Sequence, residues 1–479
     1  MRRMMRAAAA AVLSVALVAP ALAAPAANTG SAPWYAVGRA IFAEAVNIRT
    51  AVGNNGTPEL AEKLAARFRA AGFPDQDIHV VRHKDTAALV VRYRGDGSSG
   101  KKPILAIAHM DVVDALASDW SRDPFEFAEI DGYFYGRGTS DDKIGVVALA
   151  TAFLRMKAEG YVPTRDLILE FSGDEETTGE TTALLAREHR DLIDAEYALN
   201  ADAGGGAFNE QGQILPFGLQ TSEKIYASFT LTTRNRGGHS SGPRRDNAIY
   251  QLAQALLKVQ DARFPSHIND TTRLSLVADM KDRPAGDPIA EAARRFIANP
   301  ADEAAADVLE ASEEYVGSTR TTCVATLLQG GHGENALPQS AQATVNCRIF
   351  PGESIATVQG ILAAAIGDPG VEVKPIGTIW EAEGSPLRQD VMDAYTRALR
   401  RNHPGVTVVP SMSLGASDGI ILRHFGIPTY GVDGSWAVVP IDDRAHGQDE
   451  RLPVKAFEDD VDHWYWMLTD LGGKGRKRR

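Results

Sequence analysis

The stretch from residue 104 to residue 176 constrains the fold of this chain more than any other part of its sequence. It contains two short, continuous apolar runs, at residues 104–108 and 167–171, which are typical of strands buried on both faces of a parallel sheet. The polar residues that follow the runs are His109, Asp111, Asp174, Glu175 and Glu176. Because ligands bind at the carboxyl ends of the strands in open α/β sheets, we expect an α/β fold with its site at this edge.

The residue types at this edge indicate a metal site. One imidazole and several carboxylates are the ligands that Zn²⁺, Mn²⁺ and Co²⁺ accept, and a further carboxylate beside them could serve as a general base. The acidic pair Glu175 and Glu176 does not decide this alone, because adjacent carboxylates are also common on ordinary helix surfaces.

Three motifs strengthen this hypothesis: HMDVV from His109, GRGTSDDK around Asp141, and GDEETTG around Glu175. In this order and spacing they resemble the co-catalytic zinc exopeptidases, which include carboxypeptidase G, carboxypeptidase S, aminoacylase, carnosinase-type dipeptidases and succinyl-diaminopimelate desuccinylase. The resemblance extends from about Trp34 to the last predicted helix, at residues 454–471. It implies a catalytic domain with a mostly parallel sheet and an inserted lid domain.

The resemblance also implies five ligands for two divalent metal ions. They are His109, Asp141 (the bridging carboxylate), Glu176, Asp202 and His446. His109 and Asp202 would hold one ion, and Glu176 and His446 the other. Asp202 departs from the pattern of many relatives, because Ala203 separates it from the glycines that follow.

The remaining polar residues of these motifs have expected catalytic roles. Glu175 would act as the general base for a hydroxide held between the two ions. Asp111 would hydrogen-bond the ring of His109 and fix its tautomer, although a solvated surface aspartate is the alternative. Family members commonly hold a cis peptide after the bridging aspartate, so we expect one between Asp141 and Asp142.

Further substrate-binding residues follow from the same resemblance. His239, in GGHSSGP, resembles the lid histidine that stabilises the tetrahedral oxyanion. Asn335 and Arg348 match lid residues that hold the substrate, and Arg348 suits a carboxylate, although a structural salt bridge is the alternative. Gly415 and Asp418 lie in SLGASDG, which resembles the substrate-facing loop of the family.

The order of predicted elements divides the chain into domains. Residues 222–380 read strand–helix–strand–strand–helix–strand, the order of a ferredoxin-like domain. This lid would interrupt a catalytic domain made of residues 34–221 and 381–472. Within it, residues 264–320 form an acidic, mostly helical insertion. The resemblance also implies a possible homodimer, because in many relatives the lid edges pair and place the residue that matches His239 in the partner's site. An exposed strand edge would favour such pairing, or the insertion could cover the edge and mimic the partner.

Two smaller features leave alternatives open. The three glycines at residues 204–206 could suggest a phosphate loop, but no P-loop Lys-Ser/Thr accompanies them, so a tight turn beside the site is expected. Cys323 and Cys347 lie equally far from Asn335, and a symmetric hairpin would place them opposite one another. They are either bonded or two free, buried thiols.

The N-terminus and the charge bear on the compartment and the partners. Residues 1–23 combine a basic start, a short apolar run and the triplet Ala-Leu-Ala, as in a secretory signal peptide; an uncleaved membrane anchor is the alternative. Cleavage would remove three Arg and no acidic residue, which takes the net charge from −12 to −15. We therefore expect a periplasmic or secreted protein with no nucleic-acid partner and, after cleavage, no membrane partner.

The expected function is metal-dependent hydrolysis of an amide next to a free carboxylate, in a dipeptide, a short peptide or an N-acyl amino acid. Aminoacylase-like deacylation is the main alternative to peptidase action. A non-catalytic binding protein on the same scaffold would require the loss of Glu175 or of a ligand, and all of these residues are present.

Overall fold

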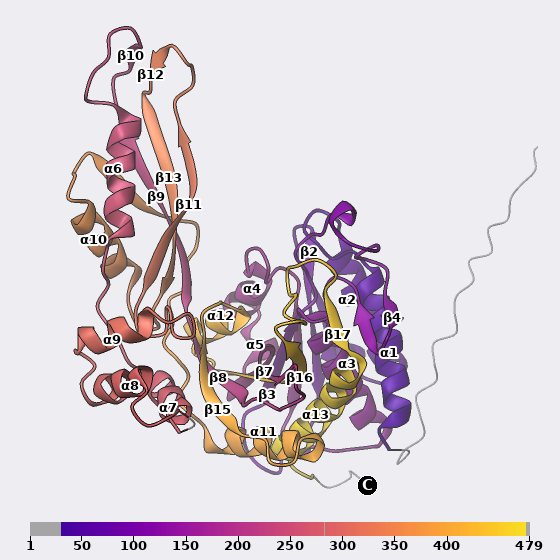
Figure 1. Cartoon of the computed structure of the whole chain (residues 1–479). Helices are drawn as coiled ribbons and strands as arrows, with labels where there is room; N and C mark the ends of the chain where they lie inside the picture. The colour runs from indigo at the N-terminus through magenta and orange to yellow at the C-terminus, as the bar shows by residue number, and fades with distance from the viewer. Residues whose placement is uncertain (1–29, 282, 476–479) are drawn as a thin grey trace, which may run out of the picture.

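The computed structural model describes residues 30–281 and 283–475. The chain forms an α/β body, from which an arm projects (Figure 1). The predicted signal peptide at residues 1–23 lies outside the described residues. Within the described ranges, no helix combines the length and the apolar character that crossing a membrane requires.

The body is built on an eight-stranded, mostly parallel sheet in the order β1-β2-β6-β3-β7-β16-β8-β15. The strands are β1 (Ile78–His83), β2 (Thr86–Tyr93), β3 (Ile104–His109), β6 (Leu167–Ser172), β7 (Tyr197–Asn209), β8 (Phe217–Glu223), β15 (Val408–Ser413) and β16 (Thr429–Val439). β3 runs parallel to both of its neighbours, β6 and β7, at the centre of the sheet. β16, from late in the chain, lies between β7 and β8.

Helices cover both faces of this sheet, which explains the continuous apolar runs of its central strands. The helices on one face are α1 (Ala32–Asn47), α2 (Gly56–Ala70), α3 (Lys143–Ala158), α11 (Gln389–Asn402) and α13 (Val454–Gly472). Those on the other are α4 (Glu180–Glu188), α5 (Arg190–Ile193) and α12 (Asp418–His424). In β3, Ala106 packs into the first layer and Leu105 and Ile107 into the second, so both faces of the strand must be apolar.

The arm contains a four-stranded antiparallel sheet in the order β11-β13-β9-β14. In chain order its elements are β9 (Ile225–Arg234), α6 (Ala248–Gln260), β11 (Thr322–Gly330), β13 (Ser340–Ile349), α10 (Ile355–Ile366) and β14 (Val371–Ile376). This is the predicted ferredoxin-like order of elements. The two helices cover one face of the sheet, where Phe229 and Val345 are buried against Leu252 of α6 and Leu362 of α10.

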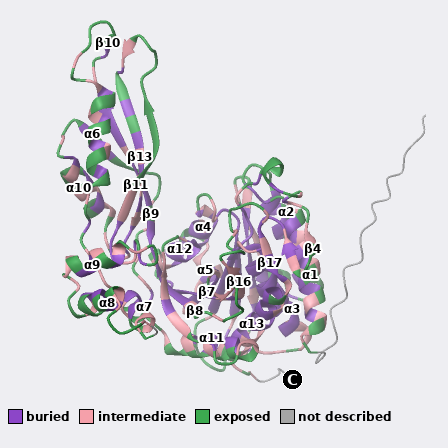
Figure 2. Cartoon of the chain, viewed as in Figure 1, coloured by how far each residue is buried: buried purple, intermediate pink, exposed green. Residues whose placement is uncertain are grey.

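The tip of the arm is a two-stranded ladder of β10 (Gly238–His239) and β12 (Ala336–Leu337). It lies at the end of the arm that is remote from the eight-stranded sheet, and its surroundings are exposed (Figure 2). The open strand β11 is exposed along most of its length, including the side chains of Val324, Leu327 and Leu328.

The insertion forms α7 (Asp270–Asp279), α8 (Pro288–Ala298) and α9 (Glu303–Glu310). These helices bury Leu276, Phe296 and Leu309 in a core of their own, and α7 packs on β15 at the base of the arm. The expectation that the insertion could cover the edge of the lid sheet is therefore wrong. Its apolar residues are used within the insertion, and the side chain of Leu328 on β11 remains 67% exposed.

The two connections between body and arm lie side by side. Ser385 N donates to Thr221 O at 2.7 Å, which joins the returning connection to the end of β8. Lys224, between β8 and β9, is fully buried, and its Nζ donates to the carbonyl oxygen of Arg320 at 2.5 Å. Burial lowers the pKa of Lys224 to about 7. The base of the arm is thus held by the insertion as well as by the body.

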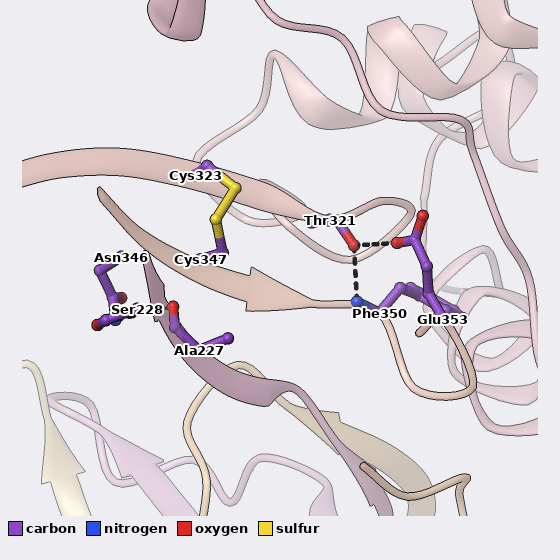
Figure 3. Close-up of a disulfide and its surroundings, with 8 residues drawn as sticks. All are labelled: Ala227, Ser228, Thr321, Cys323, Asn346, Cys347, Phe350 and Glu353. Atoms are coloured by element: carbon purple, nitrogen blue, oxygen red, sulfur yellow. Dashed lines mark hydrogen bonds between the residues drawn. A yellow bond between two sulfur atoms is a disulfide. The ribbon is translucent and has the colours of Figure 1, made fainter. Parts of the chain in front are cut away.

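The two cysteines are bonded to each other (Figure 3). Cys323 and Cys347 are directly opposed in the β11–β13 ladder, with an S–S distance of 2.02 Å, as the symmetric hairpin allowed. Nearby, the hydroxyl of Thr321 donates to Glu353 and accepts from Phe350 N. The disulfide therefore staples the hairpin close to where the arm joins the insertion.

The glycines at residues 204–206 do not form the predicted tight turn. β7 continues through them and pairs with β16, with register shifts on either side of the Gly204–Asp433 pair. Gly204 and Gly205 have φ of +93° and +75°, so they supply the conformation of a β-bulge inside the strand.

Candidate metal centre

The predicted ligands come from five separate segments at the carboxyl edge of the body sheet. His109 ends β3, Glu176 follows β6, and Asp202 lies within β7. Asp141 lies two residues before the start of α3, and His446 lies in the loop after β16.

Asp141 lies between the two histidines. Its Oδ1 is 3.0 Å from His109 Nε2, and its Oδ2 is 3.1 Å from His446 Nε2. Each oxygen of one carboxylate therefore faces a different imidazole, which is the geometry that a bridging carboxylate requires.

Each histidine has a second carboxylate beside it. Asp202 Oδ1 lies 3.7 Å from His109 Nε2, and Glu176 Oε1 lies 3.0 Å from His446 Nε2. The five side chains thus form two half-sites that share Asp141, in the grouping expected from the sequence.

This donor set fits divalent cations. Zinc bonds of about 2.0–2.2 Å in a tetrahedron place neighbouring donor atoms about 3.4 Å apart, close to the separations within each half-site. The three carboxylates also concentrate negative charge: hydrogen bonds with Asp141 and Glu176 raise the pKa of His446 to about 10. Burial opposes ionisation of Asp141, but its hydrogen bonds with the two histidines hold its pKa below the usual range. Two divalent ions would compensate this charge.

Asp111 differs in part from its expected role. His109 Nδ1 lies 3.0 Å from the backbone oxygen of Asp111 and 3.6 Å from its carboxylate Oδ1. The carboxylate is occupied instead by the backbone N–H groups of Glu175 and Glu176, each at 3.1 Å. The main chain of Asp111 therefore orients the ring of His109, while its side chain fixes the turn that carries the expected base.

The carboxylate of Glu175 lies beside the half-sites. Its side chain forms no hydrogen bond with any other described residue. Burial, and next the negative charge of Asp202, raise its pKa well above the ordinary value for a glutamate. A carboxylate with this environment is suited to accepting a proton.

The peptide bond between Asp141 and Asp142 is cis, as predicted. Asp142 is buried, and its Oδ2 accepts a hydrogen bond from His109 N at 3.2 Å. A carboxylate oxygen of Asp142 also lies within 4.8 Å of a ring nitrogen of His109 and a carboxylate oxygen of Asp202, so these three side chains could hold an ion. The Asp-Asp doublet in GRGTSDDK was the available signal for this residue.

The predicted lid residues do not reach this centre within one chain. His239 and Asn335 meet at the tip of the arm, where Ser240 N donates to Asn335 O at 2.9 Å and His239 pairs with Ala336. Figure 1 shows this tip projecting away from the body sheet. The two residues thus lie close to each other and apart from the candidate metal ligands.

Arg348 and the SLGASDG loop occupy other places. The Arg348 guanidinium lies 4.8 Å from the centroid of the Tyr226 ring and has no ion pair with a carboxylate among the described residues, so the structural salt bridge does not form. Gly415 is exposed in the loop after β15. Asp418 is buried at the start of α12, and burial raises its pKa well above the usual range.

Comparison with known proteins agrees with this architecture. The model of the peptidase family M20/M25/M40 matches residues 105–470. The chain is 28% identical over 402 residues to the probable carboxypeptidase S-like 2 of Dictyostelium discoideum, covering 80% of this chain and 74% of that protein. It is also 28% identical over 392 residues to the human N-fatty-acyl-amino acid synthase/hydrolase PM20D1, covering 77% and 74%.

Solved structures share the fold at low sequence identity. The M20 family metallo-carboxypeptidase Sso-CP2 of Sulfolobus solfataricus superposes with a TM-score of 0.66 at 17% identity, covering 90% of this chain and 98% of that one. The dipeptidase Dug1p of Saccharomyces cerevisiae has a TM-score of 0.64 at 16% identity, covering 91% and 95%. From the family match and the fold together, this chain belongs to the peptidase family M20/M25/M40 and is a metallohydrolase.

Proposed function

We propose that this chain hydrolyses the amide bond next to a free carboxylate, in dipeptides, short peptides or N-acyl amino acids. The observation that carries the proposal is the position of Asp141, whose two oxygens each face a different histidine with its own second carboxylate. His109, Asp141 and Asp202 would hold one divalent ion, and Asp141, Glu176 and His446 the other. Zn²⁺ is the expected metal, with Mn²⁺ or Co²⁺ as alternatives.

Such ions, when bound, would polarise the scissile carbonyl and make a water more acidic. Glu175 takes a proton from the attacking water as the water oxygen bonds to the carbonyl carbon. The same carboxyl then delivers this proton to the amine nitrogen as the carbon–nitrogen bond breaks. Asp111 supports these steps by holding the backbone N–H groups of Glu175 and Glu176.

We also propose that a second copy of the chain completes the site. His239 and Asn335 lie together at the tip of the arm, away from their own metal centre. Among the described residues no strand pairs with the outer edge of β11, where Val324, Leu327 and Leu328 are exposed, and an open apolar edge is suited to pairing with another strand. A homodimer through this edge would let His239 of the second copy donate to the oxyanion, and Arg348 hold the substrate carboxylate.

Export of the protein is a separate part of the proposal. The signal-like residues 1–23 motivate it, and the Cys323–Cys347 disulfide suits an oxidising compartment such as the periplasm. Fractionation of expressing cells and mass spectrometry of the mature N-terminus would test it. A cytoplasmic protein with an intact N-terminus would overturn it.

Substrate class is tested directly with purified, metal-loaded protein. Dipeptides and N-acyl amino acids are assayed beside the same compounds with an amidated carboxylate. We expect hydrolysis of the free acids and at least ~10-fold slower hydrolysis of the amides, because a carboxylate partner for Arg348 is lost. Equal rates, or no hydrolysis of either class, would contradict the proposal. Preference for N-acyl amino acids over dipeptides would favour the aminoacylase-like alternative, which the names of relatives such as PM20D1 also suggest.

A further inference from the structure

A buried ion pair joins two of the loops that carry the candidate ligands. Arg137 Nη1 lies 2.7 Å from Glu450 Oε2, and both side chains are almost completely buried, with 3% and 0% exposure. Arg137 lies four residues before Asp141, and Glu450 four residues after His446. Neither residue is among the candidate ligands, and neither has a role in the mechanism described above.

The Glu450 carboxylate accepts hydrogen bonds from most of the turn that leads to Asp141. Its Oε1 accepts from Ser140 N at 2.7 Å, Ser140 Oγ at 2.9 Å and Asp141 N at 3.2 Å. Its Oε2 accepts from Gly138 N at 3.1 Å, in addition to Arg137. One carboxylate therefore gathers three backbone N–H groups of the same turn, and both of its oxygens face only donors.

The same ion pair also holds the loop of His446. Arg137 Nη2 donates to the carbonyl oxygen of Gly447 at 3.1 Å, next to His446 in the chain. His446 itself has φ of +61°, a conformation that a non-glycine residue adopts only where its surroundings fix it. The Arg137 guanidinium lies 5.1 Å from the centroid of the Trp120 ring, which leaves it little freedom to move.

A small sheet next to Glu450 in the chain also fixes the position of the ion pair. β17 (Arg451–Pro453) pairs with β5 (Tyr133–Tyr135), and β5 pairs on its other side with β4 (Ala128–Ile130). Gly136 N donates to Glu450 O at 3.1 Å, so the ladder continues up to the ion pair. The register of these strands therefore sets where the Glu450 carboxylate meets the turn before Asp141.

We propose that Glu450 is a positioning residue of the metal centre: its carboxylate, with Arg137, sets the relative position of Asp141 and His446. It touches neither the substrate nor the metal. The inference rests on the proposed role of Asp141 and His446 as ligands. It adds that the geometry between them is imposed by a residue outside the ligand set, because the two loops are otherwise separate segments of chain.

Glu450→Gln is the direct test. Whichever way the amide turns, its NH₂ group faces either the backbone N–H groups of Ser140 and Asp141 or the Gly138 N–H and the guanidinium of Arg137. The turn must then shift, so we expect metal affinity to fall about 10–100-fold, the usual effect of losing a group that orients a ligand. In the metal-free protein, the amide hydrogens of residues 138–141 should exchange faster with solvent.

Asp442→Asn is a matched control. Asp442 is also buried in the segment before β17, and it is also paired with an arginine, Arg451, at 2.6 Å. Its carboxylate also accepts a hydrogen bond from Val438 N and, among the described residues, none from residues 138–141. A merely structural role for Glu450 predicts that both variants lose stability alike and keep wild-type metal affinity. Positioning predicts lower affinity and faster exchange in Glu450→Gln alone.

Two further variants keep the test decisive. Arg137→Lys retains the charge but cannot donate to both Glu450 and Gly447 O through one planar fork, so it should give an intermediate loss of affinity even if Glu450→Gln fails to fold. Wild-type affinity in Arg137→Lys would overturn the inference in that case. The spectrum of the Co²⁺-loaded protein should change in both Glu450→Gln and Arg137→Lys.

Asp141→Asn tests the ligand set on which the inference rests. If Asp141→Asn leaves metal binding intact, the proposed ligand set fails. If it abolishes metal binding while Glu450→Gln does not alter metal affinity, only the positioning role fails.

Discussion

His446 Nε2 lies 3.0 Å from Glu176 Oε1, although 270 residues separate them in the sequence. The contact joins the loop after β16 to the loop after β6, on either side of the central strands β3 and β7. It defines one half-site, as the proximity of His109 and Asp202 defines the other. The half-sites share only Asp141 among the five candidate ligands, so they can be disturbed separately.

Loss of one histidine should therefore remove one ion. His446→Ala leaves His109, Asp141 and Asp202 in place, and we expect about one bound metal ion per chain instead of two when free metal is limiting. Elemental analysis of the dialysed protein measures this stoichiometry. His109→Ala should behave in the same way through the opposite half-site. Two ions retained in both variants would contradict the assignment.

Glu175→Gln should separate catalysis from metal binding. We expect both ions to stay bound and turnover to fall at least ~10²-fold, because the amide cannot accept the proton of the attacking water. Glu180→Gln is the matched control, since Glu180 is in the same segment but is paired with Arg187. Near-normal turnover would show that Glu175 is not the base. Loss of metal together with activity would indicate that Glu175 and Glu176 exchange their roles.

The dimer is tested by mixing two inactive proteins. Glu175→Gln and His239→Ala chains each lack one essential residue, but a mixed dimer contains one site with both. If His239 acts in the partner's site, activity should return, to at most about one quarter of the wild-type rate per chain if subunits mix at random. Exchange must be shown independently, for example by energy transfer between labelled subunits. Demonstrated exchange without activity would mean that His239 serves its own chain.

Lys224→Met should change how stability depends on pH. The folded-state pKa of Lys224 is lowered to about 7 from an ordinary value of 10.5, so the unfolded chain binds more protons between these values. The contribution of Lys224 to the free energy of unfolding should therefore rise with pH across this window, by up to about 1.4 kcal/mol per unit, and be constant below it.

The variant lacks this titration, so its stability relative to wild type should be greatest near pH 7 and decline towards pH 10.5. The lost hydrogen bond to Arg320 O reduces the gain by about 1 kcal/mol. Denaturant unfolding at several pH values gives the comparison. A difference between the proteins that does not vary from pH 7 to pH 10.5 would contradict the lowered pKa.

The sequence predicted those parts of the fold where burial and local periodicity coincide. β3 and β6 are apolar on both faces because helices cover both, so their runs were unambiguous. β8 was missed because, apart from Phe217 and Leu219, its buried residues are polar: Thr221 bonds to Thr271, and Glu223 to Arg423 and Ser417. These partners come from distant segments of the chain, so no local sequence pattern predicts the strand.

The candidate site shows the same limit. His109 and Glu176 could be placed from the strands with which they are associated. His446 could be placed only by resemblance, because it lies in a loop without a hydrophobic period and is 270 residues from Glu176 in the sequence. The role of Glu450 depends on which backbone groups surround its carboxylate, which is a property of the folded loops. The position of His239 depends on the length and direction of the whole arm.

The place of β16 has a consequence for how the protein is made. A ribosome releases β7 and β8 before the whole arm, but it releases β16 and the loop of His446 only after the arm. Until then β7 lacks the strand that pairs with its open side, and the candidate metal centre lacks its fifth side chain. A product of premature termination before residue 429 lacks both. Translation of residues 429–446 therefore closes the sheet and completes the candidate site together, so that activity requires a chain that extends past His446.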